Sequence, residues 1–256
     1  MEGAIMDITQ TFYNTMAPHY DKLFFDWTAT THQQAAFLDK LFRSYGFDSK
    51  ARILDCACGI GTQSIGLSAL GYDVTASDIS DGELAEAKQR ADRAGVRIRF
   101  EHADFCALSD VFSEQFDIVM AMDNALPHML SAGSLEAAVK SIIGQTKTDG
   151  IFVSSIRDYD SLLEDKPSYS PPYIHKTDKG KRVSFQTWDW KDEKYHFTQY
   201  IIEDGETLQI NKFECEYRAV QREELSALLK NCGCRDVVWL FPEDTDWYQP
   251  VVVARK

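Results

Sequence analysis

Short apolar runs and amphipathic stretches alternate along the first two thirds of the chain. Each run is about five residues long and nearly continuous, as expected for strands that are covered on both faces. The first run ends at Asp55, and the later ones lie at 73–76, 97–101, 116–122 and 151–156. Between the runs, apolar residues recur every three or four positions, which predicts helices. The alternation predicts an α/β protein, with a mostly parallel sheet and helices on both of its faces.

The first 50 residues are rich in aromatic side chains. Pro18 interrupts the segment 9–25, so we expect two short helices, or one helix and an ordered loop, in that segment. Helical spacing of apolar residues over 32–45 predicts a longer helix. We interpret residues 1–50 as a helical lid over a ligand, with the hydroxyl of Tyr13 or Tyr20 near the polar end of that ligand. Core packing of these aromatic side chains is the alternative.

Beyond residue 183 the pattern changes to alternation of apolar and polar positions, which predicts antiparallel strands. The alternating segments are 183–190, 194–203 and 207–220. An amphipathic helix and two apolar strands are then expected at 222–232, 237–240 and 248–254. We therefore expect a core at 51–165, an antiparallel β insertion at 166–220, and the final helix and strands of the core at 221–256.

Composition and charge narrow the class of partner. The 256 residues are 44% apolar and carry a formal net charge of -13. Nucleic-acid affinity depends on lysine and arginine side chains that neutralise phosphates. We therefore expect a small-molecule substrate and no nucleic-acid partner, with a homo-oligomer as a possible assembly.

Location and metal content are also constrained by the sequence. Residues 1–10 lack the apolar run of a signal peptide, and no stretch is apolar enough to predict a membrane span. The six cysteines lack the spacing of zinc or redox sites. We expect reduced thiols, no metal site, no membrane partner and a cytoplasmic location.

A glycine-rich turn follows the first predicted strand. Residues 53–61 read Ile-Leu-Asp-Cys-Ala-Cys-Gly-Ile-Gly, and a helix is expected from about Gln63. Because Gly59 and Gly61 have no Cβ, the backbone can approach a nucleotide-like ligand closely. A dinucleotide fingerprint would need glycine at position 64, where this chain has Ser64. A tight strand-to-helix turn without a ligand is the alternative interpretation.

Acidic residues end the next two predicted strands. Asp78 lies 19 residues after Gly59, close to the spacing at which an acid binds a ribose diol. A helix-capping acid is the alternative for Asp78, although Ser80 already supplies a cap. Asp104 can accept a charge-assisted hydrogen bond from an N–H group of a ligand, while Phe105 and Ile79 can offer flat apolar contacts to a ring. A dinucleotide enzyme does not need this third acid besides Asp55 and Asp78.

The fourth and fifth predicted strands end in polar residues as well. Asn124 and His128 follow the fourth strand, where the strand ends of an open α/β sheet meet a ligand crevice. Arg157 follows the fifth strand and is suited to bidentate binding of a substrate carboxylate. An ion pair of Arg157 with Asp158 or Asp160 is an equally weighted alternative.

These motifs, in this order across nearly the whole chain, resemble the class I S-adenosylmethionine-dependent methyltransferases, and most closely the glycine/sarcosine N-methyltransferase group. The superfamily motifs are the glycine turn from Asp55 and Asp-Ile-Ser from Asp78. More particular are Met-Asp-Asn-Ala-Leu-Pro-His at 122–128 and Arg-Asp-Tyr-Asp-Ser-Leu-Leu at 157–163. The resemblance implies a Rossmann-like, seven-stranded sheet in the order 3-2-1-4-5-7-6, with the antiparallel insertion after the fifth strand. It also implies S-adenosylmethionine as cofactor and S-adenosylhomocysteine as product.

The resemblance assigns roles to individual residues. Met122 and His128 would line the methionine side of the cofactor, Asn124 would face a substrate amine, and Arg157 would bind an amino-acid carboxylate, so that Asn124, His128 and Arg157 form the catalytic set. The family's arginine for the cofactor carboxylate has no counterpart between positions 28 and 34, where His32 is the nearest candidate. The expected cofactor-binding residues are Tyr13, Tyr20, Asp55, Ala57, Gly59, Gly61, Asp78, Ile79, Asp104, Phe105, Met122 and His128.

We therefore expect methyl transfer from S-adenosylmethionine to a small molecule, best an N-methylation of a small amine or amino acid such as glycine or sarcosine. Small-molecule O- or C-methylation fits the first three motifs equally well. A nicotinamide-dependent oxidoreductase and a catalytically silent cofactor-binding module are further alternatives. Tyr173, Tyr200 and Tyr217 of the insertion are candidates for the substrate side of the site, with core packing as the other interpretation.

Overall fold

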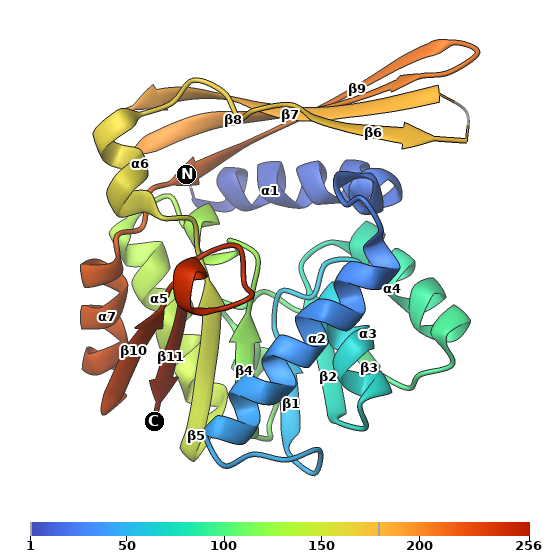
Figure 1. The fold of residues 1–256 in the computed structure, drawn as a ribbon. Helices are drawn as coiled ribbons and strands as arrows, with labels where there is room; N and C mark the ends of the chain where they lie inside the picture. Colours follow the sequence, from blue (N-terminus) through green and yellow to red (C-terminus); the bar gives the residue numbers. More distant parts are fainter. Residues whose placement is uncertain (1, 179) are drawn as a thin grey trace.

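Two β-sheets form the main layers of the molecule. The computed structural model describes residues 2–178 and 180–256, with side chains from Ile8 onward. The amino-terminal helix α1 (Glu2–Met16) lies between the larger sheet and the smaller, antiparallel sheet that extends across the top of Figure 1. Among the described residues, no helix combines the length and the apolar character that crossing a bilayer requires.

The larger sheet has seven strands in the order β10-β11-β5-β4-β1-β2-β3. Only β11 runs antiparallel to its neighbours, β5 and β10. When the strands of this sheet are numbered by their occurrence in the chain, the order is 3-2-1-4-5-7-6, which confirms the expected fold. The strands are β1 (Arg52–Asp55), β2 (Asp73–Asp78), β3 (Arg99–His102), β4 (Phe116–Ala121), β5 (Thr146–Ser155), β10 (Asp236–Leu240) and β11 (Val251–Arg255).

Helices cover both faces of this sheet, because alternate residues of its central strands point to opposite sides and are apolar on both. On one face, α2 (Trp27–Ser44) and α3 (Thr62–Ala69) pack against Ile53 and Ile118. On the other, α5 (Ala132–Gln145) and α7 (Arg222–Asn231) pack against Leu54 and Val119. The helix α4 (Asp81–Ala94) connects β2 to β3.

The amino-terminal segment breaks where proline predicts it. The helix α1 ends at Met16, and a 3-10 helix, η1 (Ala17–Leu23), carries Pro18 in its first turn. This 3-10 helix leads into α2 through Asp26, whose carboxylate caps α2 by accepting a hydrogen bond from the backbone N–H of Ala29.

The insertion forms the smaller sheet, in the order β6-β7-β8-β9. Three of its strands match the predicted ones: β7 (Gly180–Lys191), β8 (Lys194–Asp204) and β9 (Leu208–Arg218). The strand β6 (Tyr173–Thr177) and the helix α6 (Tyr159–Asp165) were not predicted, because β6 is a mostly exposed edge strand without apolar alternation and α6 is only two turns long. The sheet packs on α1 through β9, where the Tyr217 and Tyr13 hydroxyls are 3.4 Å apart.

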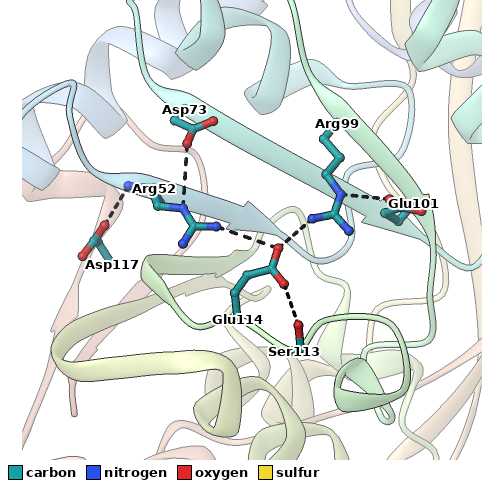
Figure 2. Close-up of polar contacts among 7 residues, drawn as sticks. All are labelled: Arg52, Asp73, Arg99, Glu101, Ser113, Glu114 and Asp117. Atoms are coloured by element: carbon teal, nitrogen blue, oxygen red, sulfur yellow. Dashed lines mark hydrogen bonds and ion pairs between the residues drawn. The ribbon is translucent and has the colours of Figure 1, made fainter.

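Charged side chains join the amino ends of the central strands of the larger sheet (Figure 2). Glu114 Oε1 lies 2.6 Å from Arg99 Nη1 and 3.8 Å from Arg52 Nη2. Asp117 Oδ2 accepts a 2.8 Å hydrogen bond from the backbone N–H of Arg52. Because these groups are partly exposed, each pair contributes at most ~1 kcal/mol. The opposite edge, at the carboxyl ends of the parallel strands, is where open α/β sheets bind ligands.

Candidate cofactor and acceptor site

A cavity of about 590 Å³ lies between the carboxyl ends of the central parallel strands and α1. Its volume is within the range of ~300–1,000 Å³ found for small-molecule sites. Asp55, Gly61, Asn124 and Arg157 lie outside its walls. The remaining predicted site residues all line it: Tyr13, Tyr20, Ala57, Gly59, Asp78, Ile79, Asp104, Phe105, Met122 and His128.

The glycine turn is shaped by left-handed backbone at both glycines. Gly59 has φ of +52° and Gly61 has φ of +87°, a region that favours glycine. Gly59 lines the cavity, and its backbone N–H donates a 2.9 Å hydrogen bond to Asp78 Oδ2. Gly61 instead packs inward, since an added Cβ would lie 3.0 Å from Ile65 Cδ1. The expected ligand contact of Gly61 is therefore replaced by a packing role at the start of α3.

Asp78 and Asp104 present carboxylates to the cavity from neighbouring strand ends. Asp78 Oδ1 accepts a 2.9 Å hydrogen bond from the backbone N–H of Ser80, and Ser80 itself caps α4. Asp78 is therefore not the cap of α4. Burial raises the pKa of Asp78, while the backbone N–H groups of Ser80 and Gly59 oppose that rise. Asp104 Oδ1 accepts a 2.8 Å hydrogen bond from the backbone N–H of Cys106, which orients its carboxylate.

Asp55 lies behind the glycine turn rather than in the cavity wall. Its side chain is fully buried, with Oδ2 accepting a 2.6 Å hydrogen bond from Ser64 Oγ. Burial raises the pKa of Asp55 from 3.8 to about 7, and the hydrogen bond from Ser64 offsets only part of this rise. Of the three acids expected around the ligand, Asp78 and Asp104 line the cavity, whereas Asp55 points toward α3.

These walls are compatible with an adenosyl group. Ile79 and Phe105 offer flat apolar contacts, the carboxylates of Asp78 and Asp104 offer hydrogen-bond acceptors, and Gly59 offers backbone without a Cβ. A mostly apolar cleft with a few convergent polar groups is the usual form of a cofactor site.

A polar cluster that was not predicted closes one part of the cavity. Gln63 Nε2 donates hydrogen bonds to Asp123 Oδ2 at 2.6 Å and to Gln34 Oε1 at 2.8 Å. The Tyr248 hydroxyl donates a 2.8 Å hydrogen bond to Asp123 Oδ1. Gln63 directly follows the glycine turn and could have been found from that position. Tyr248, in the loop before β11, has no motif that would have indicated it.

His32 does not supply the missing cation for a cofactor carboxylate. It lies on α2 with its side chain exposed, outside the walls of the cavity. From the same helix, Trp27 Nε1 donates a 3.0 Å hydrogen bond to Thr62 Oγ1, and Thr62 lines the cavity. The first turn of α2 thus contacts the cavity wall at Thr62 through the neutral side chain of Trp27.

His128 forms a short chain of polar contacts with two tyrosines. Its Nε2 lies 2.8 Å from the Tyr13 hydroxyl, which is 3.4 Å from the Tyr217 hydroxyl. Its ring packs against that of Tyr217 with centroids 4.2 Å apart. Burial lowers the pKa of His128 from 6.5 to about 3, so the imidazole is neutral at pH 7.

Arg157 lies in a box of aromatic and polar side chains beside this chain of contacts. Its Nη1 donates a 3.0 Å hydrogen bond to the Tyr195 hydroxyl, and its Nη2 donates a 3.0 Å hydrogen bond to Gln186 Oε1. Three ring centroids lie 5.0 to 5.5 Å from the guanidinium carbon, those of Trp188, Phe197 and Tyr217. In the described part of the chain, no carboxylate forms an ion pair with Arg157.

The acids that follow Arg157 have a different partner. Asp158 forms an ion pair with Arg222, and Asp160 Oδ2 lies 3.4 Å from Arg222 Nη1. The alternative that Arg157 pairs with these acids is therefore wrong. Tyr195 was missed in the sequence because it lies in an insertion strand whose position over Arg157 depends on the fold.

Asn124 holds the backbone of Arg157 in place by a hydrogen bond. Its Oδ1 accepts a 3.1 Å hydrogen bond from the Arg157 backbone N–H, and its Nδ2 donates a 3.0 Å hydrogen bond to the Tyr159 hydroxyl. The side chain is buried and outside the cavity walls. In this arrangement Asn124 positions Arg157, which differs from the expectation that it faces a substrate amine.

The candidate tyrosines of the insertion separate into two groups. Tyr217 is buried and contacts His128 and Tyr13. Tyr173 is 64% exposed, and Tyr200 stacks on Phe185 with ring centroids 4.9 Å apart. Of the three, Tyr217 alone contacts residues of the candidate site.

Comparisons with known proteins agree with this fold. A family model described as "Methyltransferase domain" matches residues 53–150. Glycine/sarcosine N-methyltransferase from Parasynechococcus marenigrum (strain WH8102) is 28% identical over 254 residues, covering 96% of this chain and 85% of the relative. The enzyme of the same description from Aphanothece halophytica is 26% identical over 238 residues, covering 90% of this chain and 84% of the relative.

A solved structure extends the agreement to three dimensions. The S-adenosylmethionine-dependent methyltransferase from Clostridium acetobutylicum ATCC 824 superposes with a TM-score of 0.73 at 20% identity, covering 95% of this chain and 97% of the other. That likeness supports the fold, while the family model and the relatives support the methyl-transfer chemistry and S-adenosylmethionine as cofactor. Together these findings show that the chain carries a methyltransferase domain and is an S-adenosylmethionine-dependent methyltransferase.

Proposed function

We propose that this methyltransferase acts on the nitrogen of a small amine, and most specifically on an amino acid such as glycine or sarcosine. The observation that carries the proposal is the guanidinium of Arg157, which is enclosed by neutral side chains and has no carboxylate partner among the described residues. A charged group in such a setting is favoured when a ligand of opposite charge completes it. The similarity to glycine/sarcosine N-methyltransferases at 26% and 28% identity supports the same substrate class.

The residues around the cavity suit methyl transfer by alignment. Bound S-adenosylmethionine supplies an electrophilic methyl group on its sulfonium, so the protein has mainly to orient the acceptor and exclude water. Orientation of this kind contributes ~7–11 kcal/mol to lowering a barrier. In our proposal Arg157 binds the acceptor carboxylate in a bidentate manner, and Asn124 keeps the Arg157 backbone in place.

The acceptor nitrogen needs a free lone pair, so the amine has to lose its proton before or on binding. His128 adds no positive charge beside it, because the His128 pKa near 3 leaves the ring neutral at pH 7. The short contact between His128 Nε2 and the Tyr13 hydroxyl holds both side chains at the cavity wall. We propose that these two groups and Tyr217 orient the neutral amine.

The cofactor roles of individual residues are part of the same proposal. Asp78 would accept hydrogen bonds from the ribose hydroxyls, Asp104 would accept one from the adenine amino group, and Ile79 and Phe105 would flank the ring. Residues 1–50 would act as the lid, and residues 166–220 would cover the acceptor from above. The location of α1 between the two sheets supports this division (Figure 1).

Other parts of the interpretation stay predictions. They are a cytoplasmic location, a homo-oligomer as a possible assembly and the lack of a nucleic-acid partner. Small-molecule O- or C-methylation is the alternative reaction, and a catalytically silent cofactor-binding module is the alternative to turnover. A panel of amine, hydroxyl and activated-carbon acceptors, assayed with radiolabelled S-adenosylmethionine, distinguishes all of these activities.

The Arg157→Gln variant tests the acceptor assignment. A hydrogen-bonded contact with a charged group is worth ~1.5–3 kcal/mol, so we expect KM for an amino-acid acceptor to rise ~10- to 100-fold. The dissociation constant for S-adenosylmethionine, measured by calorimetry, should change less than ~2-fold, because Arg157 lies outside the walls of the cavity.

An exposed arginine provides the matched control. Arg235 pairs with Asp149 on the surface, so Arg235→Gln should leave both constants unchanged. Equal losses of acceptor and cofactor affinity in Arg157→Gln would contradict the assigned role. Methylation of hydroxyl acceptors without methylation of amines would replace N-methylation by the alternative reaction.

A further inference from the structure

The described walls of the cofactor cavity are short of positive charge. Lys194, at the start of β8, is the only lysine or arginine among the described residues that line the cavity, whereas Asp78, Asp104 and Asp123 all line it. S-adenosylmethionine carries a carboxylate at its methionine end beside an ammonium group and a sulfonium. The cavity is therefore better matched to the two cationic groups than to the carboxylate.

Four hydrogen bonds hold the turn formed by Asp123 and Asn124 in a fixed position. The backbone N–H of Asp123 donates a 2.8 Å hydrogen bond to Ser155 Oγ. The backbone N–H of Asn124 donates a 2.9 Å hydrogen bond to the carbonyl oxygen of Ser155. The Asp123 carboxylate accepts hydrogen bonds from Gln63 and Tyr248. Asp123 and Asn124 both have positive φ, +54° and +70°, which is costly for residues with a side chain. This strained turn presents a carboxylate beside Thr62, Gln63 and Met122 in the cavity wall.

Two arginines that could supply a positive charge, Arg90 and Arg157, have other partners. Arg90 Nη2 lies 3.2 Å from Asp21 Oδ2 and 3.4 Å from Glu86 Oε2, outside the cavity walls. Arg157 donates to Tyr195 and Gln186, also outside those walls. The cavity wall also offers neutral donors, including the hydroxyls of Tyr20 and Thr62.

We propose that Asp123 holds the α-ammonium group of S-adenosylmethionine, and that the α-carboxylate of the cofactor adds little to its binding. The proposal rests on the family's cofactor and is independent of the acceptor that the enzyme methylates. A carboxylate and an ammonium group form a charge-assisted hydrogen bond, whereas a second carboxylate close to Asp123 is repelled. Asp123 thereby takes the leading role in binding the methionine end of the cofactor, for which this chain has no arginine counterpart between positions 28 and 34.

Two cofactor analogues separate the groups in the wild-type protein. Calorimetry compares S-adenosylmethionine with its decarboxylated analogue, which lacks the carboxylate, and with its deaminated α-keto analogue, which lacks the ammonium. We expect the decarboxylated analogue to bind within ~3-fold of the cofactor or more tightly, and the deaminated analogue to bind ~10- to 100-fold more weakly. Because wild-type protein is used, this ranking does not depend on the folding of a variant.

Two variants then assign the effect to Asp123. Asp123→Asn removes the charge with little change of shape, and it should weaken cofactor binding while removing most of the penalty for deamination. Tyr248→Phe removes a hydrogen bond to Asp123 but keeps the carboxylate, so the ranking of the three ligands should persist. Thermal unfolding of both variants identifies any loss of fold.

The opposite ranking overturns the proposal. If the decarboxylated analogue binds ~10-fold or more weakly than the cofactor, a cation holds the carboxylate and Asp123 does not dominate this end. The proposal also fails if Asp123→Asn lowers stability but leaves the penalty for deamination unchanged, because Asp123 would then be a purely structural residue. Methylation assays with amino-acid acceptors are not used, so the result is separate from the test of Arg157.

Discussion

Gly66 offers a sensitive test of the packing that supports the cofactor cavity. It lies in α3 where this helix meets α2, and an added Cβ would lie 2.6 Å from Ala35 Cβ and 2.7 Å from the Thr31 carbonyl oxygen. Carbon atoms pack at ~3.5–4.0 Å, so alanine at this position would push the helices apart by about 1 Å. The Thr31 contact involves a backbone atom, which cannot rotate away.

The expected magnitude follows from two opposing effects. Overpacking of a core contact costs ~1–3 kcal/mol. Alanine in place of glycine regains ~1 kcal/mol of helix propensity. The net result for Gly66→Ala is a loss of up to ~2 kcal/mol in the free energy of unfolding, which lowers the unfolding midpoint by up to ~8 °C in a chain of this size.

The displacement of α2 from α3 should also affect the cofactor cavity. From α2, Trp27 donates to Thr62 and Gln34 accepts from Gln63, so moving α2 away from α3 strains both contacts. We expect weaker binding of S-adenosylmethionine in calorimetry, by ~3- to 10-fold if one neutral hydrogen bond is lost.

Gly144 supplies the matched control for this variant. It lies in α5, and an added Cβ would meet no atom within 4 Å. Thermal unfolding should show Gly144→Ala to be more stable than the wild type by up to ~1 kcal/mol. If Gly66→Ala were stabilised to the same extent, the close approach of α2 and α3 would be wrong.

Two further predictions concern titration and surface charge. Asp55 has a pKa near 7 in the folded protein, so its contribution to stability is present at acidic pH and is lost as the pH rises from about 4 to 7, by ~4 kcal/mol at most. Urea unfolding across this range should therefore show that the stability of the Asp55→Asn variant increases relative to that of the wild type as the pH rises. Parallel pH profiles of the two proteins would contradict the burial of Asp55. Glu114→Gln removes the ion pairs with Arg52 and Arg99 and should cost at most ~2 kcal/mol in thermal unfolding, less in high salt; a larger, salt-independent loss would contradict their exposure.

Much of the fold could be predicted because the carboxyl ends of parallel strands meet along one edge. Asp78 ends β2 and Asp104 closely follows the end of β3, so their convergence at the cavity follows from the alternation of strands and helices alone. The glycine turn was recognisable because the chain passes from strand to helix there with positive φ at Gly59, a conformation that favours glycine. Helix ends and the edge strand β6 were less predictable, because they depend on local packing rather than on periodicity.

Side-chain direction limited the prediction of the site. Asp55 and Asp78 both end strands, yet Asp55 faces Ser64 behind the turn while Asp78 faces the cavity. Asn124 looked like a substrate contact, but its amide is used by the Arg157 backbone and Tyr159. Strand ends indicate the edge at which a residue lies, and the turn that follows decides where its side chain points.

The sequence by itself determined the strands and the helical layers, because apolar periodicity decides which faces must be buried. The strand order and the cofactor class followed from the resemblance of its motifs to a known family, since the glycine turn and the acids are local in the chain. Only the tertiary structure decided which distant polar groups share a hydrogen bond. Tyr248 meets Asp123 across 125 positions, and Tyr195 meets Arg157 across 38. Such pairs carry no local signal, since their energy depends on the relative placement of whole elements, which is fixed when the apolar faces pack.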